Sequence, residues 1–171
     1  MIEVHPFGNF IPSNTQYLLL GSFTTKPSDD YLWFYANGRN QFWPIMEEVY
    51  GLRLDTKDKQ QSLFQNLNMA LADIILSCER SNNSNLDNNL ANIVYNTKAV
   101  NNIFRKNNTK KVFFTSRFVE STFSRLFKDF SETYFETKLI YLPSPSPRYA
   151  AISKEEKIRR YKELLPRLSK S

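Results

Sequence analysis

The chain has 171 residues, a formal net charge of +6 and 41% hydrophobic residues, which fits one folded domain, residues 1–171, and excludes disordered and fibrous proteins. It contains one cysteine, Cys78, and one histidine, His5, which excludes a disulfide framework and the usual zinc and iron–sulfur ligand sets. We therefore expect chemistry without a metal or other cofactor.

The positive net charge suits a polyanionic partner such as DNA, although many enzymes are mildly basic. No apolar stretch approaches the length of a membrane span, and the first residues lack the pattern of a signal peptide. We expect a soluble, cytoplasmic monomer with no membrane partner.

Hydrophobic patterns in the first fifty residues predict an arm, a buried strand and a helix. The N-terminal arm, residues 5–12, is too rich in proline and glycine for a regular element. The run from Tyr17 to Leu20 is continuously apolar and stops at Gly21, as in a strand that is buried on both faces. Helical spacing begins at Gln41, and Asn40 stands where an N-cap is expected.

The remaining chain alternates between strand and helix patterns. Strands are predicted at 111–115 and 138–142, and at 70–76 a strand is favoured over a helix. Helices are predicted at 97–104, 118–130 and 153–165, the last with a capping box at Ser153, and a short helix or turn at 62–67. Residues 55–61 are a polar stretch, and the polar, Asn-rich residues 80–89 are predicted to be an ordered surface loop. This alternation predicts an α/β fold, a three-layer αβα sandwich around a central, mostly parallel, four-stranded sheet.

Two loops directly follow predicted strands, so we expect them to meet at the carboxyl edge of the sheet, where open α/β sheets bind ligands. One is residues 22–40. The other, the serine–proline loop, is residues 143–149 and contains Pro143-Ser-Pro-Ser-Pro147. Its Ser144 and Ser146 hydroxyls are able to hold a phosphate, and a rigid turn without a binding role is an equally good interpretation.

Three segments together resemble the uracil-DNA glycosylase superfamily. They are Gly21-Ser-Phe, the stretch from Phe34 to Trp43, and Leu142-Pro-Ser-Pro-Ser-Pro147. The chain is most similar to the branch of hypoxanthine-DNA glycosylases and shares an Asn-X-Phe-Trp segment with the mismatch-specific uracil glycosylases. The resemblance implies a base-excision-repair hydrolase that binds DNA, flips out a deaminated base, uracil or hypoxanthine, and hydrolyses its N-glycosidic bond.

The resemblance also implies roles for single residues. Asn40 matches the catalytic amide of the hypoxanthine-excising branch, and Tyr35 matches the aromatic residue that stacks on the flipped base. The base pocket would be lined by Gly21, Ser22 and Phe23 together with Tyr35. The residues expected to bind DNA are Arg39, Ser144, Pro145, Ser146, Pro147 and Arg148.

Three positions depart from the superfamily pattern: Phe23 replaces a water-activating Asp or Asn, Leu142 replaces a His or Asn, and Thr24 replaces a proline. These departures favour an alternative, a DNA-binding member of the same fold without activity. A small nucleotide-binding α/β protein is the third hypothesis.

Several residues have simpler interpretations. Asn40 could be an ordinary N-cap and Tyr35 a core residue. Asp73 and Asp87 could be pocket carboxylates, or could make structural hydrogen bonds. Cys78 is expected to be buried and inert. The positions expected at the surface are Arg117, Arg125 and Lys128.

Overall fold

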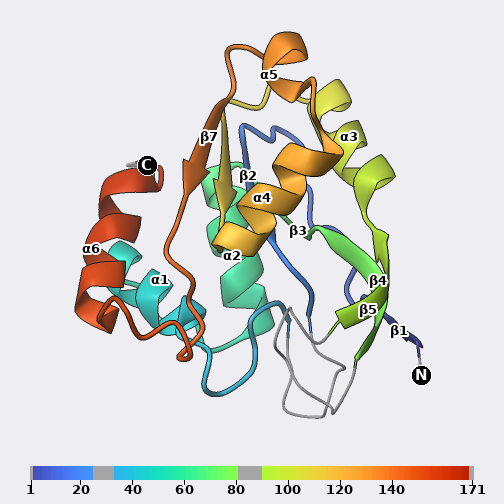
Figure 1. The fold of residues 1–171 in the computed structure, drawn as a ribbon. Coiled ribbons are helices and arrows are strands. Elements are labelled where there is room, and N and C mark those ends of the chain that lie inside the picture. The colour runs from blue at the N-terminus through green and yellow to red at the C-terminus, as the bar shows by residue number, and fades with distance from the viewer. Residues whose placement is uncertain (1, 25–32, 81–89, 170–171) are drawn as a thin grey trace.

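The computed structural model describes residues 2–24, 33–80 and 90–169, and its centre is a parallel sheet (Figure 1). The strands are β2 (Tyr17–Gly21), β3 (Met69–Asp73), β6 (Lys111–Phe114) and β7 (Lys138–Tyr141), in the order β3-β2-β6-β7. Every pair in this sheet is parallel. The predicted α/β class with a parallel four-stranded sheet is confirmed.

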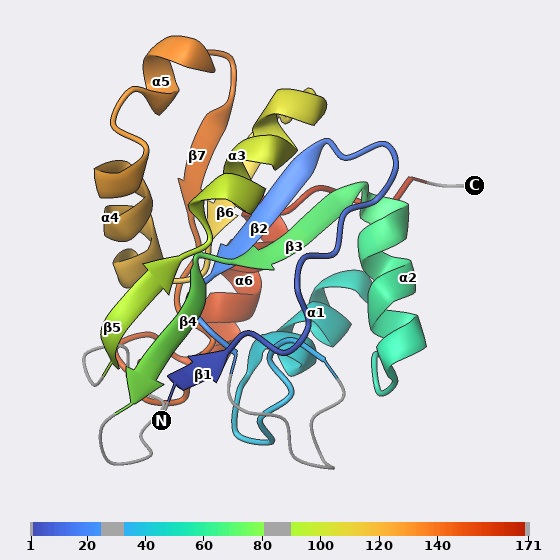
Figure 2. The same cartoon turned by 90° about the vertical axis from the view of Figure 1, so that its right-hand side faces the viewer.

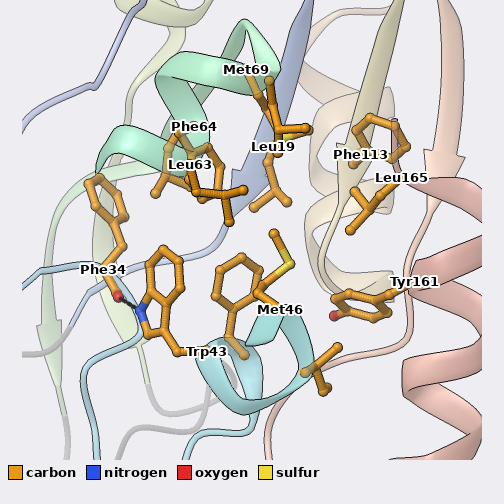
Figure 3. Packing of buried hydrophobic residues seen from close by; sticks show 14 of the residues in the cluster. Leu19, Phe34, Trp43, Met46, Leu63, Phe64, Met69, Phe113, Tyr161 and Leu165 are labelled. Atoms are coloured by element: carbon orange, nitrogen blue, oxygen red, sulfur yellow. Dashed lines mark hydrogen bonds between the residues drawn. The ribbon is translucent and has the colours of Figure 1, made fainter. Parts of the chain in front are cut away.

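Helices cover both faces of this sheet. One face carries α1 (Phe42–Tyr50), α2 (Lys57–Leu67) and α6 (Lys154–Leu164), and the other carries α3 (Thr97–Lys106), α4 (Arg117–Leu126) and α5 (Phe130–Thr133). Strand β2 is apolar throughout because its side chains alternate between two buried layers. Leu19 packs with Phe64, Trp43 and Tyr161 on the first face (Figure 3), whereas Leu18 and Leu20 pack on the second.

A second sheet, which the sequence analysis did not predict, lies beside the first (Figure 2). It is antiparallel and consists of β1 (Ile2–Val4), β4 (Ile75–Arg80) and β5 (Leu90–Tyr95), in the order β1-β4-β5. The predicted single strand at 70–76 is wrong, because β3 ends at Asp73 and β4 starts two residues later. The hydrophobic pattern gave no sign of this break, because Ile74, which separates the two strands, is apolar and buried like Ile75 after it.

Element boundaries also differ from the predictions. The short helix or turn predicted at 62–67 is a helix that starts earlier, because α2 begins at Lys57 within the polar stretch 55–61. It is amphipathic with a polar outer face, and Thr56 accepts the capping hydrogen bond of Lys59 N–H. The helix predicted through 130 ends at Leu126. The cap at Ser153 is confirmed by its hydrogen bond from Glu156 N–H. Residues 81–89, which hold Asp87 and most of the surface loop predicted at 80–89, lie outside the described residues.

Candidate functional site

A pocket of about 640 Å³ lies at the carboxyl ends of all four parallel strands. Strand β2 leads into its wall at Ser22, β3 ends in it at Asp73, β6 leads into it at Thr115, and β7 ends in it at Tyr141. The described residues that line it are Ser22, Phe23, Thr24, Tyr35, Ala36, Asn37, Arg39, Asn40, Asp73, Thr115, Ser116, Arg117, Tyr141, Ser144, Pro145, Ser146, Pro147, Arg148 and Tyr149.

The structure brings the predicted site residues together around this pocket. Asn40, Ser22, Phe23, Tyr35 and Arg39 line it, and so do all five residues of the serine–proline loop from Ser144 to Arg148. Gly21 lies directly behind the wall. A methyl group on Gly21 would overlap both the Tyr35 hydroxyl and Asp73 Oδ1, so the close approach of these two side chains requires glycine at this position.

Tyr35 forms an aromatic wall of the pocket. Its ring stacks on Phe42, with ring centroids 4.2 Å apart and an interplanar angle of 22°, and its hydroxyl lies 3.2 Å from Thr115 Oγ1. Its backbone φ of +58° is in the left-handed region, which a bulky residue adopts only when its surroundings hold it there. The stacking on Phe42 and the hydrogen bond between the Tyr35 hydroxyl and Thr115 therefore fix the orientation of this ring.

The Asn40 side chain uses its amide oxygen within the protein. Its Oδ1 accepts a hydrogen bond from Phe42 N–H at 2.9 Å, and no described residue accepts one from Nδ2. The predicted position of the N-cap is wrong by one residue, because α1 starts at Phe42 and its N-cap is Gln41, whose side chain makes no capping bond. Asn40 nevertheless binds the first turn of the helix, and it retains two N–H donors for a ligand.

The serine–proline loop is stiffened by its own hydroxyls. Ser144 Oγ accepts from Ser146 N–H at 3.2 Å, and Ser146 Oγ accepts from Arg148 N–H at 3.3 Å. Because each hydroxyl oxygen is an acceptor in these bonds, its hydrogen remains able to donate to an anion. Tyr161 binds the Pro143 carbonyl at 2.6 Å and anchors the start of the loop to α6.

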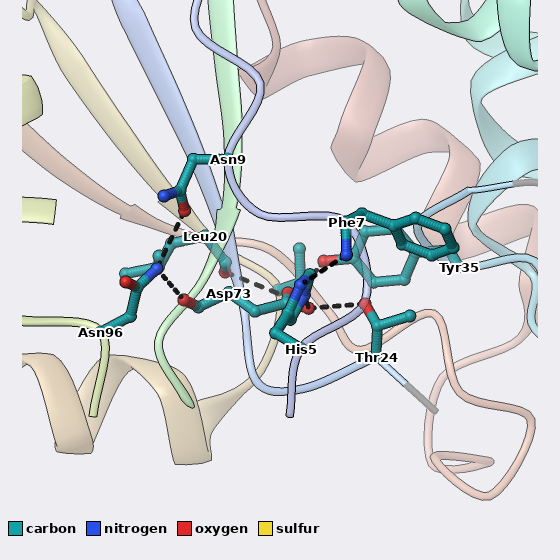
Figure 4. A network of polar contacts seen from close by, with 9 residues as sticks. His5, Phe7, Asn9, Leu20, Thr24, Tyr35, Asp73 and Asn96 are labelled. Carbon is teal, nitrogen blue, oxygen red and sulfur yellow. Dashed lines mark hydrogen bonds and ion pairs between the residues drawn. The ribbon is translucent and has the colours of Figure 1, made fainter. Parts of the chain in front are cut away.

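Asp73 provides a buried carboxylate in the pocket (Figure 4). Its Oδ2 accepts hydrogen bonds from Thr24 Oγ1 and His5 Nε2, both at 2.7 Å, and the residue is 3% exposed. Both interpretations that the sequence left open for Asp73 hold in the structure, because its carboxylate is hydrogen-bonded and also lines the pocket. It is the only carboxylate among the described residues of the lining.

Cationic and aromatic side chains form the rim. The guanidinium of Arg117 lies 3.6 Å from the centroid of the Tyr141 ring, and it also pairs with Glu120 at 2.8 Å. Burial and a hydrogen bond with Tyr149 raise the pKa of Tyr141 to about 12, so its hydroxyl is protonated at neutral pH. Arg117 is exposed, as predicted, but its place on the pocket was not predicted from the sequence.

One signal would have found Thr115 and Arg117. Both lie just beyond the carboxyl end of a strand, the rule that had already identified Ser22 and Ser144. The same rule did not reach Asp73, because the strand that ends there was predicted to continue to residue 76. Thr24 lies in the loop after β2, which the same rule had identified. His5 had no such signal, because the N-terminal arm reaches Asp73 from a distant part of the sequence.

A metal site, a membrane span and a reactive thiol each require particular features of the described residues. The described residues contain no group of three or more His, Cys, Asp or Glu side chains placed to hold a metal ion. In the same residues, no helix has the length and apolar character needed to cross a bilayer. Cys78 is fully buried, as the sequence predicted.

The fold has a solved counterpart. The chain is similar to the solution NMR structure of a protein from Methanosarcina acetivorans described as a "putative Uracil DNA glycosylase", with a TM-score of 0.65 and 21% sequence identity. The match covers 96% of this chain and 99% of the other. No protein-family model and no curated protein matches the sequence. The likeness shows that the two proteins share one α/β fold over nearly their whole lengths.

Proposed function

We propose that this protein is a DNA glycosylase that flips a deaminated base, uracil or hypoxanthine, out of DNA and hydrolyses its N-glycosidic bond. The observation that carries the proposal is the pocket, where a fixed aromatic ring, a buried carboxylate and an amide converge beside the serine–proline loop. The resemblance of Gly21-Ser-Phe and the Phe34–Trp43 segment to uracil-DNA glycosylases supports it, as does the description of the structural neighbour.

The pocket has the size of a small-molecule site, about 300–1,000 Å³, with its volume of about 640 Å³. A single extruded base needs such a pocket, because enzymes of this kind cannot reach the glycosidic bond within the stacked duplex. Tyr35 would stack on the base, an interaction of about 1–3 kcal/mol that offsets part of the cost of unstacking.

Breaking the bond builds negative charge on the base and positive charge on the sugar, so donors near the base lower the barrier. Asn40 is our candidate for this donor, since its Nδ2 hydrogens have no described acceptor. Asp73 would play the complementary role of an acceptor. Uracil and hypoxanthine each carry a ring N–H that is able to donate a hydrogen bond to its carboxylate. Phe23 stands where the superfamily often has an Asp or Asn after the first strand. In this pocket the carboxylate comes instead from Asp73, at the end of β3.

The loop and rim residues suit the DNA backbone. Ser144 and Ser146 have hydroxyl hydrogens available for phosphate oxygens, and Pro145 and Pro147 keep the loop rigid where it would meet the duplex. Arg39, Arg148 and Arg117 are exposed cations around the opening. These contacts hold the backbone without reading sequence, and we propose that a single copy of the chain binds the DNA.

The test is an excision assay on oligonucleotides that carry one uracil, hypoxanthine or xanthine, single-stranded and paired, in buffer with EDTA. Alkali then cleaves at any abasic site. We expect cleavage at uracil or hypoxanthine without added metal. Binding of abasic-site DNA without excision of any base would instead support the non-catalytic DNA-binding alternative, and no binding of any DNA would refute the proposal.

A further inference from the structure

His5 lies behind the pocket wall, outside the pocket itself. Its side chain is 4% exposed and packs in an aromatic cage of Phe7, Phe23 and Phe34, with ring centroids 5.0–6.3 Å away. A histidine in such an apolar cage keeps its place only if both of its ring nitrogens are hydrogen-bonded. In this structure both are, and one of the partners is the pocket carboxylate.

The two hydrogen bonds of His5 fix which ring nitrogen carries the proton. Phe7 N–H donates to His5 Nδ1 at 3.3 Å, so Nδ1 is an acceptor. In a neutral imidazole the other nitrogen then carries the hydrogen, and Nε2–H donates to Asp73 Oδ2 at 2.7 Å (Figure 4). Thr24 donates to the same oxygen. Asp73 Oδ1 receives no hydrogen bond from any described residue, so it keeps its capacity to accept one.

The backbone of the N-terminal arm is held independently of this side chain. Phe10 and Leu71 exchange two backbone hydrogen bonds of 2.9 Å, and His5 N–H donates to the Leu76 carbonyl at 2.8 Å. Asn96 Nδ2 binds both Asn9 Oδ1 and the Asp73 carbonyl, at 2.9 and 3.0 Å. The arm therefore stays in place when the imidazole is replaced, and the effect of the side chain on Asp73 can be measured by itself.

We propose that His5 is a positioning residue of the pocket, which orients Asp73 so that Oδ1 faces the flipped base as an acceptor. Through His5, the N-terminal arm would then help to orient a pocket residue, although the arm itself would not contact the substrate. The expected effect on the rate of excision rests on the proposed function. The hydrogen bond between His5 and Asp73 does not, because it can be observed without a substrate.

The first experiment uses the fact that the chain has a single histidine. Long-range ¹H–¹⁵N NMR of the whole protein reports one imidazole, without any need for assignment. We expect the Nε2–H tautomer, with signals that shift in Asp73→Asn. A predominant Nδ1–H tautomer, or signals that do not respond to Asp73→Asn, overturns the proposal whether or not the protein excises a base.

The second experiment measures single-turnover excision of the base that the wild type removes. His5→Phe keeps an aromatic ring in the cage and loses the donor, and His5→Gln places an amide N–H near the position of Nε2. A hydrogen bond to a charged group contributes about 1.5–3 kcal/mol, so we expect His5→Phe to slow excision about 10- to 100-fold. His5→Gln should recover most of the rate, and affinity for abasic-site DNA, which lacks the base, should not change.

A double-mutant cycle separates positioning from packing. If His5 acts through Asp73, His5→Phe causes no further loss of rate in an Asp73→Asn background. A loss of equal size in both backgrounds, or a His5→Gln rate no better than that of His5→Phe, shows a structural role only and overturns the proposal. If His5→Phe fails to fold, His5→Gln and the NMR experiment decide. Lack of excision by the wild type contradicts the proposed function and leaves the NMR result to decide this inference.

Discussion

Lys157 Nζ lies 2.8 Å from Gln41 Oε1 and so joins α6 to the residue that precedes α1. The same ammonium donates to the Ser146 carbonyl at 3.1 Å, and Gln41 N–H donates to the Pro145 carbonyl at 2.8 Å. Lys157 is 1% exposed, and burial lowers its pKa. The buried Lys157 ammonium thus connects the N-terminus of α1, which follows Asn40, with the serine–proline loop.

Replacing Lys157 by Met should weaken DNA binding while changing stability only modestly. The lost hydrogen bonds are offset by no longer burying a charge, so the free energy of unfolding should change by less than about 2 kcal/mol. Affinity for abasic-site DNA should fall at least about 10-fold, because a mispositioned loop loses contacts of this order. Denaturant unfolding and fluorescence anisotropy measure the two effects. Lys154→Met, at an exposed position of the same helix, is the control, and equal affinities in the two variants would contradict the prediction.

Replacing Gly21 by Ala should damage the pocket. The new methyl group overlaps the Tyr35 hydroxyl and Asp73 Oδ1, and such overpacking costs about 1–3 kcal/mol. We expect lower stability together with loss of excision. Gly38→Ala is the matched control, since no atom lies within 4 Å of the added Cβ there. Wild-type excision by Gly21→Ala would show that the geometry behind the pocket wall is not needed for activity.

The fold was predictable because the buried strands are continuous apolar runs separated by helical patterns. The second sheet was not, because β5 exposes Val94 and leaves no clean alternation, and the strand at 70–76 hides a break at Ile74. The strand-end rule located the serine–proline loop and Ser22 from the sequence. It could not locate His5, whose contact with Asp73 spans 68 residues and depends on how the N-terminal arm packs.

Alkaline pH should destabilise the protein through Tyr161, which is buried, and Tyr141, which is partly buried. Burial raises the pKa of Tyr161 above its ordinary value of 10.0, and the pKa of Tyr141 is raised to about 12. A raised folded-state pKa contributes stability that is fully present below pH 10 and is lost as pH rises above it. Melting temperature should therefore fall from pH 10 to 12, less steeply in Tyr161→Phe. At pH 7, Tyr161→Phe should cost about 1–3 kcal/mol, because the buried Pro143 carbonyl loses its donor. An unchanged slope above pH 10 would contradict this assignment.

The rim arginines should contribute to affinity without reading sequence. If Arg148 and Arg117 each neutralise one phosphate, replacing either by Ala should reduce the slope of log K against log salt by about one unit. The loss of affinity should be the same for every sequence. Arg105→Ala removes an exposed cation in the last turn of α3 and should leave the slope unchanged. Equal slopes for all three variants and the wild type would exclude Arg148 and Arg117 as phosphate contacts.

The most direct test of the account is detection of the released base by mass spectrometry after incubation with DNA that carries uracil or hypoxanthine, for wild type and Asn40→Ala. Hydrolysis of the glycosidic bond predicts free base and an unbroken strand with an abasic site. Loss of the Asn40 donor should slow base release at least ~10²-fold, with abasic-site affinity nearly unchanged. Thermal melting checks the lost Phe42 hydrogen bond, which should cost about 0.5–2 kcal/mol. DNA that is bound but keeps its base, or an Asn40→Ala variant as fast as wild type, would contradict the account.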